Sequence, residues 1–192
     1  LIYKGLISGC MAQKVAGSIL INTGHSGLES DEYVSMLRDQ QVRPIFMVHD
    51  VIPISHPNYC RSGERAKHIN RIKNAMHIAN GIVCNSQATM DSLVETCRAF
   101  QWNMPPTVVA LLASDLPNLP WNDRPMVQPY FVFLSTVEPR KNHLMIFRVW
   151  QRLTAKFGNA APRLIVIGQR GWLHSDTTRL LEESPALRSM VT

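Results

Sequence analysis

The sequence has no apolar run near the roughly 18 residues that a membrane-spanning helix requires. Its first 14 residues have neither the length nor the flanks of a signal peptide. The four cysteines form no CxxC pair and have no histidine partners at zinc-finger spacing. Scattered cysteines fit a reducing compartment better than secretion, so we expect a cytoplasmic protein.

Two motifs of nucleotide enzymes are also missing. No GxGxxG sequence opens a helix, which disfavours a Rossmann dehydrogenase. No DxD element or carboxylate cluster indicates a metal. The net charge of +6 favours an anionic partner: a nucleotide, a phospholipid surface, an acidic glycan or a nucleic acid. A nucleic-acid-binding protein should show aromatic platforms or a recognised motif among its cations, and because neither is present we expect no nucleic-acid partner.

Apolar runs alternate with amphipathic helical patterns. The predicted strands span residues 18–22, 45–48, 81–85, 107–112, 130–135 and 163–168. The predicted helices span residues 31–39, 63–79, 142–157 and 176–183, with another after Ser86. Asp31 and Ser86 are expected to cap their helices, and the proline-containing segment 51–62 is expected to be loop. This alternation predicts an α/β fold with parallel sheets, and the wholly apolar run 45–48 predicts a sheet covered on both faces.

The composition divides the chain in two. Segment 114–129 is polar and rich in proline, which is typical of an inter-domain linker. Residues 1–113 then form the later part of one α/β domain, and residues 130–192 begin a second. The second part has 63 residues, fewer than the ~100 that a doubly wound domain usually needs, and residues 186–192 resemble the approach to another strand. Both domains are therefore expected to be incomplete, in a chain truncated at both ends.

The turn Glu138-Pro139-Arg140-Lys141-Asn142 lies between an apolar strand and a helix that Asn142 can cap. Open α/β sheets bind ligands at the carboxyl ends of their strands, and a helix N-terminus offers free N–H groups to phosphate. Arg140 can fork onto phosphate oxygens, and Lys141 can act as a point charge. The turn predicts a diphosphate site, although a solvated turn with two surface cations would show the same pattern.

Several segments spread from about Ile19 to Trp172 share one resemblance: NTGHSGLE, HDVIPISHPNYCR, VCNSQATMDSL, STVEPRKNHL and IVIGQRGW. Together they resemble the retaining GT-B glycosyltransferases of family 4 (glycosyl transferases group 1), in particular mannosyltransferase-like enzymes of surface polysaccharide synthesis. The resemblance implies a GT-B fold of two Rossmann-like domains, with the acceptor side in residues 1–113 and the nucleotide-sugar side in residues 130–192.

The same resemblance implies an activity. A hexose, here mannose from GDP-mannose, would move with retention to a glycan or lipid-linked acceptor, as in lipopolysaccharide synthesis. The nucleotide sugar would be a substrate, with no cofactor and no metal. The family's paired glutamates, seven residues apart, would lie beyond Thr192, so the chain alone is expected to be inactive. The alternative is a non-catalytic nucleotide-binding or assembly module of the same fold.

The resemblance also assigns residues. It places the donor diphosphate on Lys141, with Arg140 beside it. Ser135 and Thr136 stand where many members carry Gly and Arg, which puts one phosphate contact in doubt unless Arg140 replaces it.

His49 and Asp50, which close the strand at 45–48, are implied to lie in the cleft. His49 would face the transferred sugar, and Asp50 would organise the loop or meet the acceptor. A histidine at a strand end is as often a hydrogen-bonded structural residue. The remaining predicted cleft residues, for which a plain turn or a helix cap is the alternative role, are Gly24, His25, Ser86 and Gly168.

Segment 61–77 carries five Arg and Lys residues against Glu64. A solvated helix face explains this charge simply. The sharper hypothesis is electrostatic docking on an anionic membrane, at its inner face, where a lipid-linked acceptor would lie.

Overall fold

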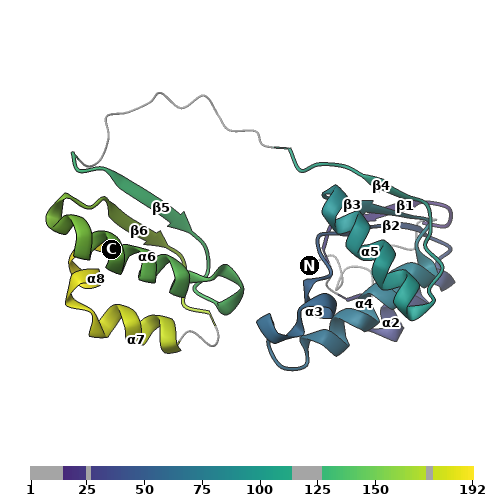
Figure 1. Cartoon of the computed structure of the whole chain (residues 1–192). Helices are drawn as coiled ribbons and strands as arrows, with labels where there is room; N and C mark the ends of the chain where they lie inside the picture. Colours follow the sequence, from purple (N-terminus) through teal and green to yellow (C-terminus); the bar gives the residue numbers. More distant parts are fainter. Residues whose placement is uncertain (1–14, 25–26, 114–126, 172–174) are drawn as a thin grey trace. The chain divides into compact units, whose positions relative to one another are not determined.

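The computed structural model describes residues 15–24, 27–113, 127–171 and 175–192. The chain forms two compact units, Leu1–Asp115 and Leu116–Thr192 (Figure 1). In both, parallel strands alternate with helices, as the sequence predicted. Within the described residues no helix combines the length and apolar character needed to cross a bilayer.

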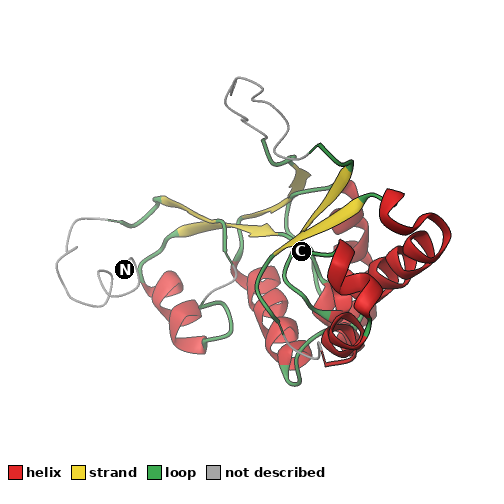
Figure 2. Ribbon diagram, turned by 90° about the vertical axis from the view of Figure 1, so that its left-hand side faces the viewer, coloured by secondary structure: helices red, strands yellow, loops and turns green. Residues whose placement is uncertain are grey.

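Unit 1 contains a four-stranded parallel sheet in the order β1-β2-β3-β4. Its strands are β1 (Ile19–Asn22), β2 (Arg43–Val48), β3 (Gly81–Cys84) and β4 (Thr107–Val109). Its helices are α2 (Asp31–Asp39), α3 (Ile52–Ser55), α4 (Glu64–Ile78) and α5 (Gln87–Phe100). Each strand pairs with the next along the chain, so right-handed crossovers place all the helices on one face of the sheet. Figure 2 shows the helices below the strands in this way.

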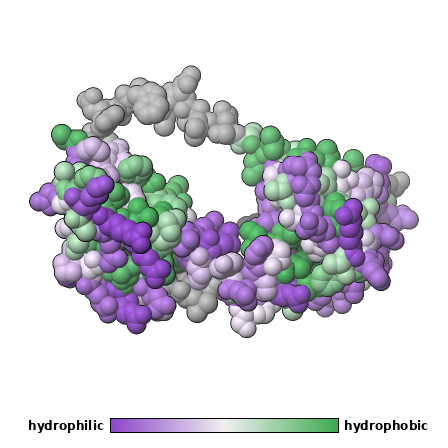
Figure 3. All heavy atoms as spheres, viewed as in Figure 1, coloured by the Kyte–Doolittle hydropathy of each residue, from purple (hydrophilic) through white to green (hydrophobic). Residues whose placement is uncertain are grey.

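The core of unit 1 lies between that face and the helices. Phe46 and Cys84 point from the strands toward buried Ile72 and Leu93 of the helices. The other face of the sheet is open within the described residues, with Val108 57% exposed, and Figure 3 shows hydrophobic side chains gathered there over β4 and its neighbours. The prediction of a sheet covered on both faces is therefore wrong for the described residues, because the strand order carries every helix to the same side.

Two local predictions for unit 1 need correction. Segment 51–62, predicted as loop, contains α3 and the 3-10 helix Pro57–Tyr59. Its prolines lie in first turns, where a missing N–H costs nothing. Helix α2 is capped by Ser30, whose Oγ accepts a hydrogen bond from the Tyr33 N–H, and not by Asp31. Asp31 instead lies in the first turn, where a negative charge suits the helix dipole.

Unit 2 is built on a parallel pair, β5 (Tyr130–Leu134) and β6 (Arg163–Ile167). Its helices are α6 (His143–Phe157), α7 (Ser175–Glu183) and α8 (Pro185–Met190). Phe147, Trp150, Leu164 and Leu187 form its core. Residues 186–192, predicted as the approach to a strand, first complete α8, which Ser184 caps. Val191 then forms a parallel bridge to Leu164 of β6, and Thr192 donates to the Leu164 carbonyl oxygen and accepts from the Val166 N–H.

Candidate functional site

The predicted residues of unit 1 gather at the carboxyl ends of β1, β2 and β3. This edge forms because parallel strands end on the same side of a sheet. His49 follows β2, and its Nε2 donates a hydrogen bond to the carbonyl oxygen of Thr23, which follows β1, at 2.7 Å. The Thr89 hydroxyl lies 2.9 Å from the His49 carbonyl oxygen. His49 therefore ties three segments together at the edge.

Asp50 organises the loop after β2. Its Oδ1 accepts a hydrogen bond from the Ile52 N–H at 3.0 Å and so begins α3. Its carbonyl oxygen accepts one from Nε2 of His68 at 3.1 Å. His68 is 3% exposed, and burial lowers the pKa of its imidazole. These contacts hold the loop after β2 in place.

Ser86 caps α5, as the sequence predicted. Its Oγ accepts a hydrogen bond from the Thr89 N–H at 3.1 Å and donates one to Thr89 Oγ1 at 3.0 Å. Thr89 also lies 2.9 Å from Asn85 Oδ1. The buried Thr89 hydroxyl is thus the centre of a polar cluster under this edge.

The glycine loop after β1 is only partly described. Gly24 is exposed, and its N–H bonds the Asn22 side chain at 2.9 Å. A Cβ on Gly24 would meet nothing closer than that same side chain, at 3.9 Å. His25, predicted beside it in the cleft, lies outside the described residues.

The edge of unit 2 is held mainly by backbone pairing beyond β5 and β6. The N–H groups of Ser135, Val137 and Gly171 donate to Ile167, Gln169 and Val137 respectively. A Cβ on Gly168 would collide with the carbonyl oxygen of Ser135. This close approach of two backbones therefore requires glycine at position 168.

The cationic turn follows this pairing. Residues Pro139–Lys141 form a 3-10 helix, and Asn142, at φ 54°, caps α6 with its Oδ1 3.3 Å from the Met145 N–H. Among the described residues the N–H groups of His143 and Leu144 have no acceptor. Lys141 forms no ion pair within the same part of the chain. Free N–H groups and an unpaired cation at one turn suit an anionic ligand.

Glu138 is the residue of this turn that the sequence reading passed over. Its side chain is 4% exposed, and Oε1 lies 2.7 Å from Nη2 of Arg140, whose own side chain is 35% exposed. Ser135 and Thr136, predicted as diphosphate contacts, lie just before it, with Thr136 exposed and Ser135 half-buried. The sequence signal for this ion pair was a glutamate two residues before an arginine.

His143 begins α6 and is 1% exposed. It packs beside Phe133 and Phe147, with ring centroids 4.7 and 6.3 Å away. Neither of its ring nitrogens has a hydrogen-bond partner among the described residues. Burial lowers the pKa of this imidazole, an effect that the Glu138 carboxylate partly offsets. Both His143 and His68 could have been found as members of apolar helical stripes, four residues before Phe147 and Ile72.

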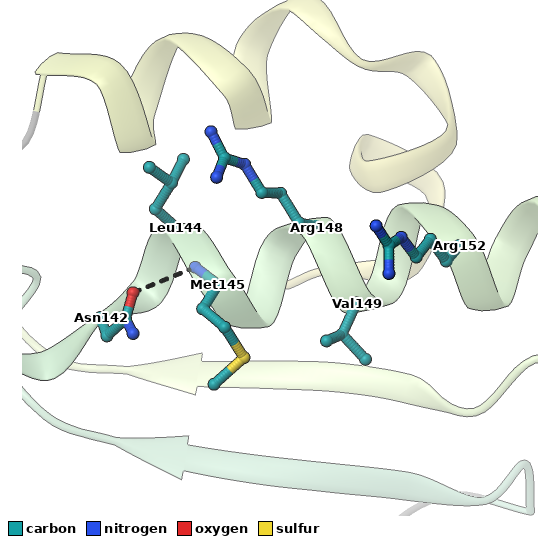
Figure 4. A pocket seen from close by; sticks show the side chains of 6 residues that line it. All are labelled: Asn142, Leu144, Met145, Arg148, Val149 and Arg152. Atoms are coloured by element: carbon teal, nitrogen blue, oxygen red, sulfur yellow. Dashed lines mark hydrogen bonds between the residues drawn. The ribbon is translucent and has the colours of Figure 1, made fainter.

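A hollow of about 350 Å³ lies on the outer side of α6 (Figure 4). It begins at the cap and is lined by Asn142, Leu144, Met145, Arg148, Val149 and Arg152. A second hollow, of about 470 Å³, lies at the end of α5 remote from Ser86 and is lined in part by Trp102. Neither of these two hollows is lined by a predicted site residue, although the first begins at Asn142, which follows Lys141 in the chain.

The predicted cationic face of helix α4 is partly neutralised by ion pairs. Arg71 pairs with Glu29 through Nε and Nη2, at 3.1 and 3.3 Å, and lies 3.7 Å from Glu64. The pairing raises the pKa of Arg71 and lowers that of Glu29. Lys67 lies 3.5 Å from Glu64. Arg65 and Lys73 remain exposed, so part of the predicted cationic face is neutralised.

No group of three His, Cys, Asp or Glu side chains in the described ranges could hold a metal ion. No protein-family model matches the sequence, and no curated protein matches it. The fold is similar to that of TarM, a GT-B glycosyltransferase, with a TM-score of 0.59 and 16% identity over 91% of this chain. A variant of S. aureus TarM in complex with Fondaparinux, alpha-GlcNAc-glycerol and UDP gives a TM-score of 0.61 with 15% identity.

The chain spans about a third of the length of these structures, 32% in each case. The likeness shows the fold: this is an α/β chain with parallel sheets that matches part of the GT-B glycosyltransferase fold. The predicted fold class is thereby confirmed.

Proposed function

We propose that this chain belongs to a glycosyltransferase that moves a hexose from a nucleoside-diphosphate sugar to a glycan or lipid-linked acceptor. The observation that carries the proposal is the cationic turn at the carboxyl edge of β5 and β6, in a chain that matches the GT-B fold. UDP in the complex of one similar structure supports a nucleoside diphosphate as the ligand class. The activity is assigned to a longer protein, because the chain spans 32% of each similar structure.

In this proposal the diphosphate lies at the edge of unit 2. Lys141 supplies an unpaired charge, Arg140 a planar set of donors, and Ser135 and Thr136 hydroxyl groups. When the bond from the sugar to the diphosphate breaks, negative charge grows on the departing nucleotide. Fixed cations and N–H groups stabilise that charge most where it develops, which lowers the barrier to transfer. This step requires no metal, and we propose a metal-independent reaction.

The sugar and the acceptor would meet the edge of unit 1. His49 would lie near the transferred sugar, Asp50 would hold the loop beside it, and Gly24, His25 and Ser86 would border the acceptor. Gly168, at the edge of unit 2, would border the donor. The finer assignments are mannose from GDP-mannose, retention of configuration and a role in surface polysaccharide or lipopolysaccharide synthesis. They rest on the sequence resemblance to family 4. A place in the cytoplasm is proposed separately, from the four scattered cysteines.

Contact with the inner face of an anionic membrane through residues 61–77 is a further part of the proposal. Arg71 is engaged by Glu29 and Glu64, so the exposed Arg65, Lys67 and Lys73 are the cations to test. Charge reversal at these three positions should abolish flotation with phosphatidylglycerol vesicles. If the triple variant floats as the wild type does, α4 has no such role.

The second candidate is a nucleotide-binding or assembly module that lacks catalysis. The observation in its favour is that the polar groups of His49, Asp50 and Ser86 already serve internal hydrogen bonds. It predicts nucleotide binding without sugar transfer in the longest protein that contains this chain.

The first test is ligand-observed NMR on the 192-residue chain with UDP, GDP and their sugar derivatives. The diphosphates should bind and uridine or guanosine should not, because the site holds phosphate. Lys141→Ala should weaken binding about tenfold, which corresponds to one charge-assisted contact of about 1.4 kcal/mol. Lys73→Ala makes the same charge change on α4 and should have no effect. Absence of binding by either diphosphate, or equal effects of the two variants, would overturn the proposal.

A further inference from the structure

Glu138 places a carboxylate where the proposed ligand is an anion. With its side chain 4% exposed, the charge is largely removed from water, a state that is costly unless the charge is paired. Such a residue beside a diphosphate would weaken binding through repulsion if it had no other task. Its presence in the cationic turn therefore calls for a compensating role.

The partner of this carboxylate is Arg140. Oε1 of Glu138 lies 2.7 Å from Nη2 as an ion pair, and the guanidinium side chain remains 35% exposed. The contact lacks hydrogen-bond geometry, so Oε1 has no hydrogen-bond partner among the described residues. A guanidinium has five N–H donors in a rigid plane, so one edge can face the carboxylate while the rest faces outward. The neighbouring Lys141 has no ion pair within the described residues. The two adjacent cations thus differ: Arg140 is anchored and Lys141 is not.

The carboxylate is itself held in place. A Cβ on Gly171 would lie 3.2 Å from Cβ of Glu138 and 2.8 Å from the Val137 carbonyl oxygen, so the strand extension after β6 packs against this residue. The Glu138 carbonyl oxygen accepts the Lys141 N–H at 3.1 Å, which fixes the turn. Inward from the turn lies the buried aromatic cluster around His143. The carboxylate, backed by close-packed backbone, is therefore a fixed negative charge beside the guanidinium.

We propose that Glu138 is a positioning residue that orients Arg140 toward the donor diphosphate. The inference rests on the proposed function, because it presumes that a diphosphate binds at this turn. A free arginine side chain loses rotamer entropy when it is fixed, and an arginine held in advance loses less on binding. The anchored Arg140 supplies geometry, and the unanchored Lys141 supplies charge.

The direction in which one substitution changes the affinity for UDP distinguishes positioning from simple repulsion. Glu138→Gln keeps the shape of the side chain and removes its negative charge. If Glu138 only repels the ligand, the variant binds UDP more tightly than the wild type. If it positions Arg140, the variant binds UDP more weakly although its net charge is more positive.

The experiment is a UDP titration of the 192-residue chain and its variants by NMR. Glu138→Gln and Glu138→Asp should each weaken UDP binding about three- to tenfold, since a neutral or shorter side chain releases the guanidinium. Glu182→Gln, the same charge change on the exposed surface of α7, should leave binding unchanged. In the Arg140→Ala background, Glu138→Gln should cause no further weakening. Unchanged or tighter binding by both Glu138 variants would overturn the inference.

Guanidinium NMR of the wild-type chain provides a measurement that needs no variant to fold. The Nη groups of Arg140 should rotate slowly, whereas those of Arg148 and Arg152, which form no ion pair within the described residues, should rotate freely. Equal rotation rates would contradict the anchoring. If the wild type binds neither UDP nor GDP, the proposed function fails. If the wild type binds UDP and both Glu138 variants bind it equally well or more tightly, only the positioning role fails.

Discussion

The two strand-end edges of this molecule are built in different ways. In unit 1, side chains join the loops: His49 bonds the Thr23 carbonyl, and Thr89 lies against the His49 carbonyl. In unit 2, backbone pairing joins the loops, and the turn that follows carries Arg140, paired with Glu138, and Lys141, which forms no ion pair within the described residues. The first edge uses its polar groups internally, whereas the second has charge to offer. This difference is the reason for proposing anion binding at unit 2.

The largest expected effect tests the backbone pairing of unit 2. Gly168→Ala should destabilise this unit by about 3 kcal/mol, because the new Cβ collides with the Ser135 carbonyl oxygen and the two backbones must separate. Gly24→Ala, at the corresponding edge of unit 1, should change stability by less than about 0.5 kcal/mol, because its Cβ would meet only open space and the Asn22 side chain. Urea unfolding followed by NMR signals of each unit measures both. Equal costs at the two glycines would show that the edges are built alike.

The next effect compares the two buried histidines. His68→Leu should cost about 1–3 kcal/mol, because the Asp50 carbonyl oxygen loses its donor. His143→Leu should cost less, because the imidazole has no hydrogen-bond partner among the described residues and lies among aromatic rings. Urea unfolding of the two variants decides the order. A greater cost at His143 would mean that its ring nitrogens have a partner in solution.

The same histidines predict how stability depends on pH. Burial lowers the folded-state pKa of both from the ordinary value of 6.5, so below that pH the unfolded chain binds more protons than the folded one. The contribution of the two neutral histidines to stability is therefore fully present above about pH 6.5 and is lost as the pH falls toward their folded-state pKa values. Unfolding free energies between pH 8 and 5.5 measure this loss. His143→Leu should make the unfolding free energy of unit 2, and not that of unit 1, depend less steeply on pH. An unchanged pH dependence in unit 2 would contradict the attribution of this effect to His143.

The smallest effect concerns the caps of α5 and α6. Ser86→Ala should cost about 1 kcal/mol, since the Thr89 N–H loses its acceptor. Asn142→Gly should change stability by less than about 0.5 kcal/mol, because glycine relieves the left-handed φ of 54° while the cap bond to Met145 is lost. Thermal unfolding of both variants gives the comparison. A cost at Asn142 equal to that at Ser86 would mean that its side chain, and not its conformation, is what matters.

The sequence was sufficient for the strands and the longer helices, but it did not predict α3, α8 or the polar core. Helix α5 begins after Ser86 and α6 after Asn142 because local capping chemistry sets those boundaries. Burial of Glu138 depends instead on a cation and on a glycine-lined strand extension that only the fold brings together. The open face of the first sheet was likewise beyond prediction, because alternation of strands and helices does not encode strand order. Two sequence signals were available and unused: polar residues on apolar helical stripes, such as His143, and the spacing of Glu138 and Arg140.

The most direct test of the account is a UDP titration of the 15N-labelled chain with every amide followed. We expect the signals of residues 135–145 and 168–171 to shift and those of α4 to stay. Lys141→Ala should lower the affinity for UDP about tenfold, and His49→Ala should leave the affinity unchanged. Shifts confined to unit 1, or an affinity that does not respond to Lys141, would contradict the claim that the edge of unit 2 holds the diphosphate.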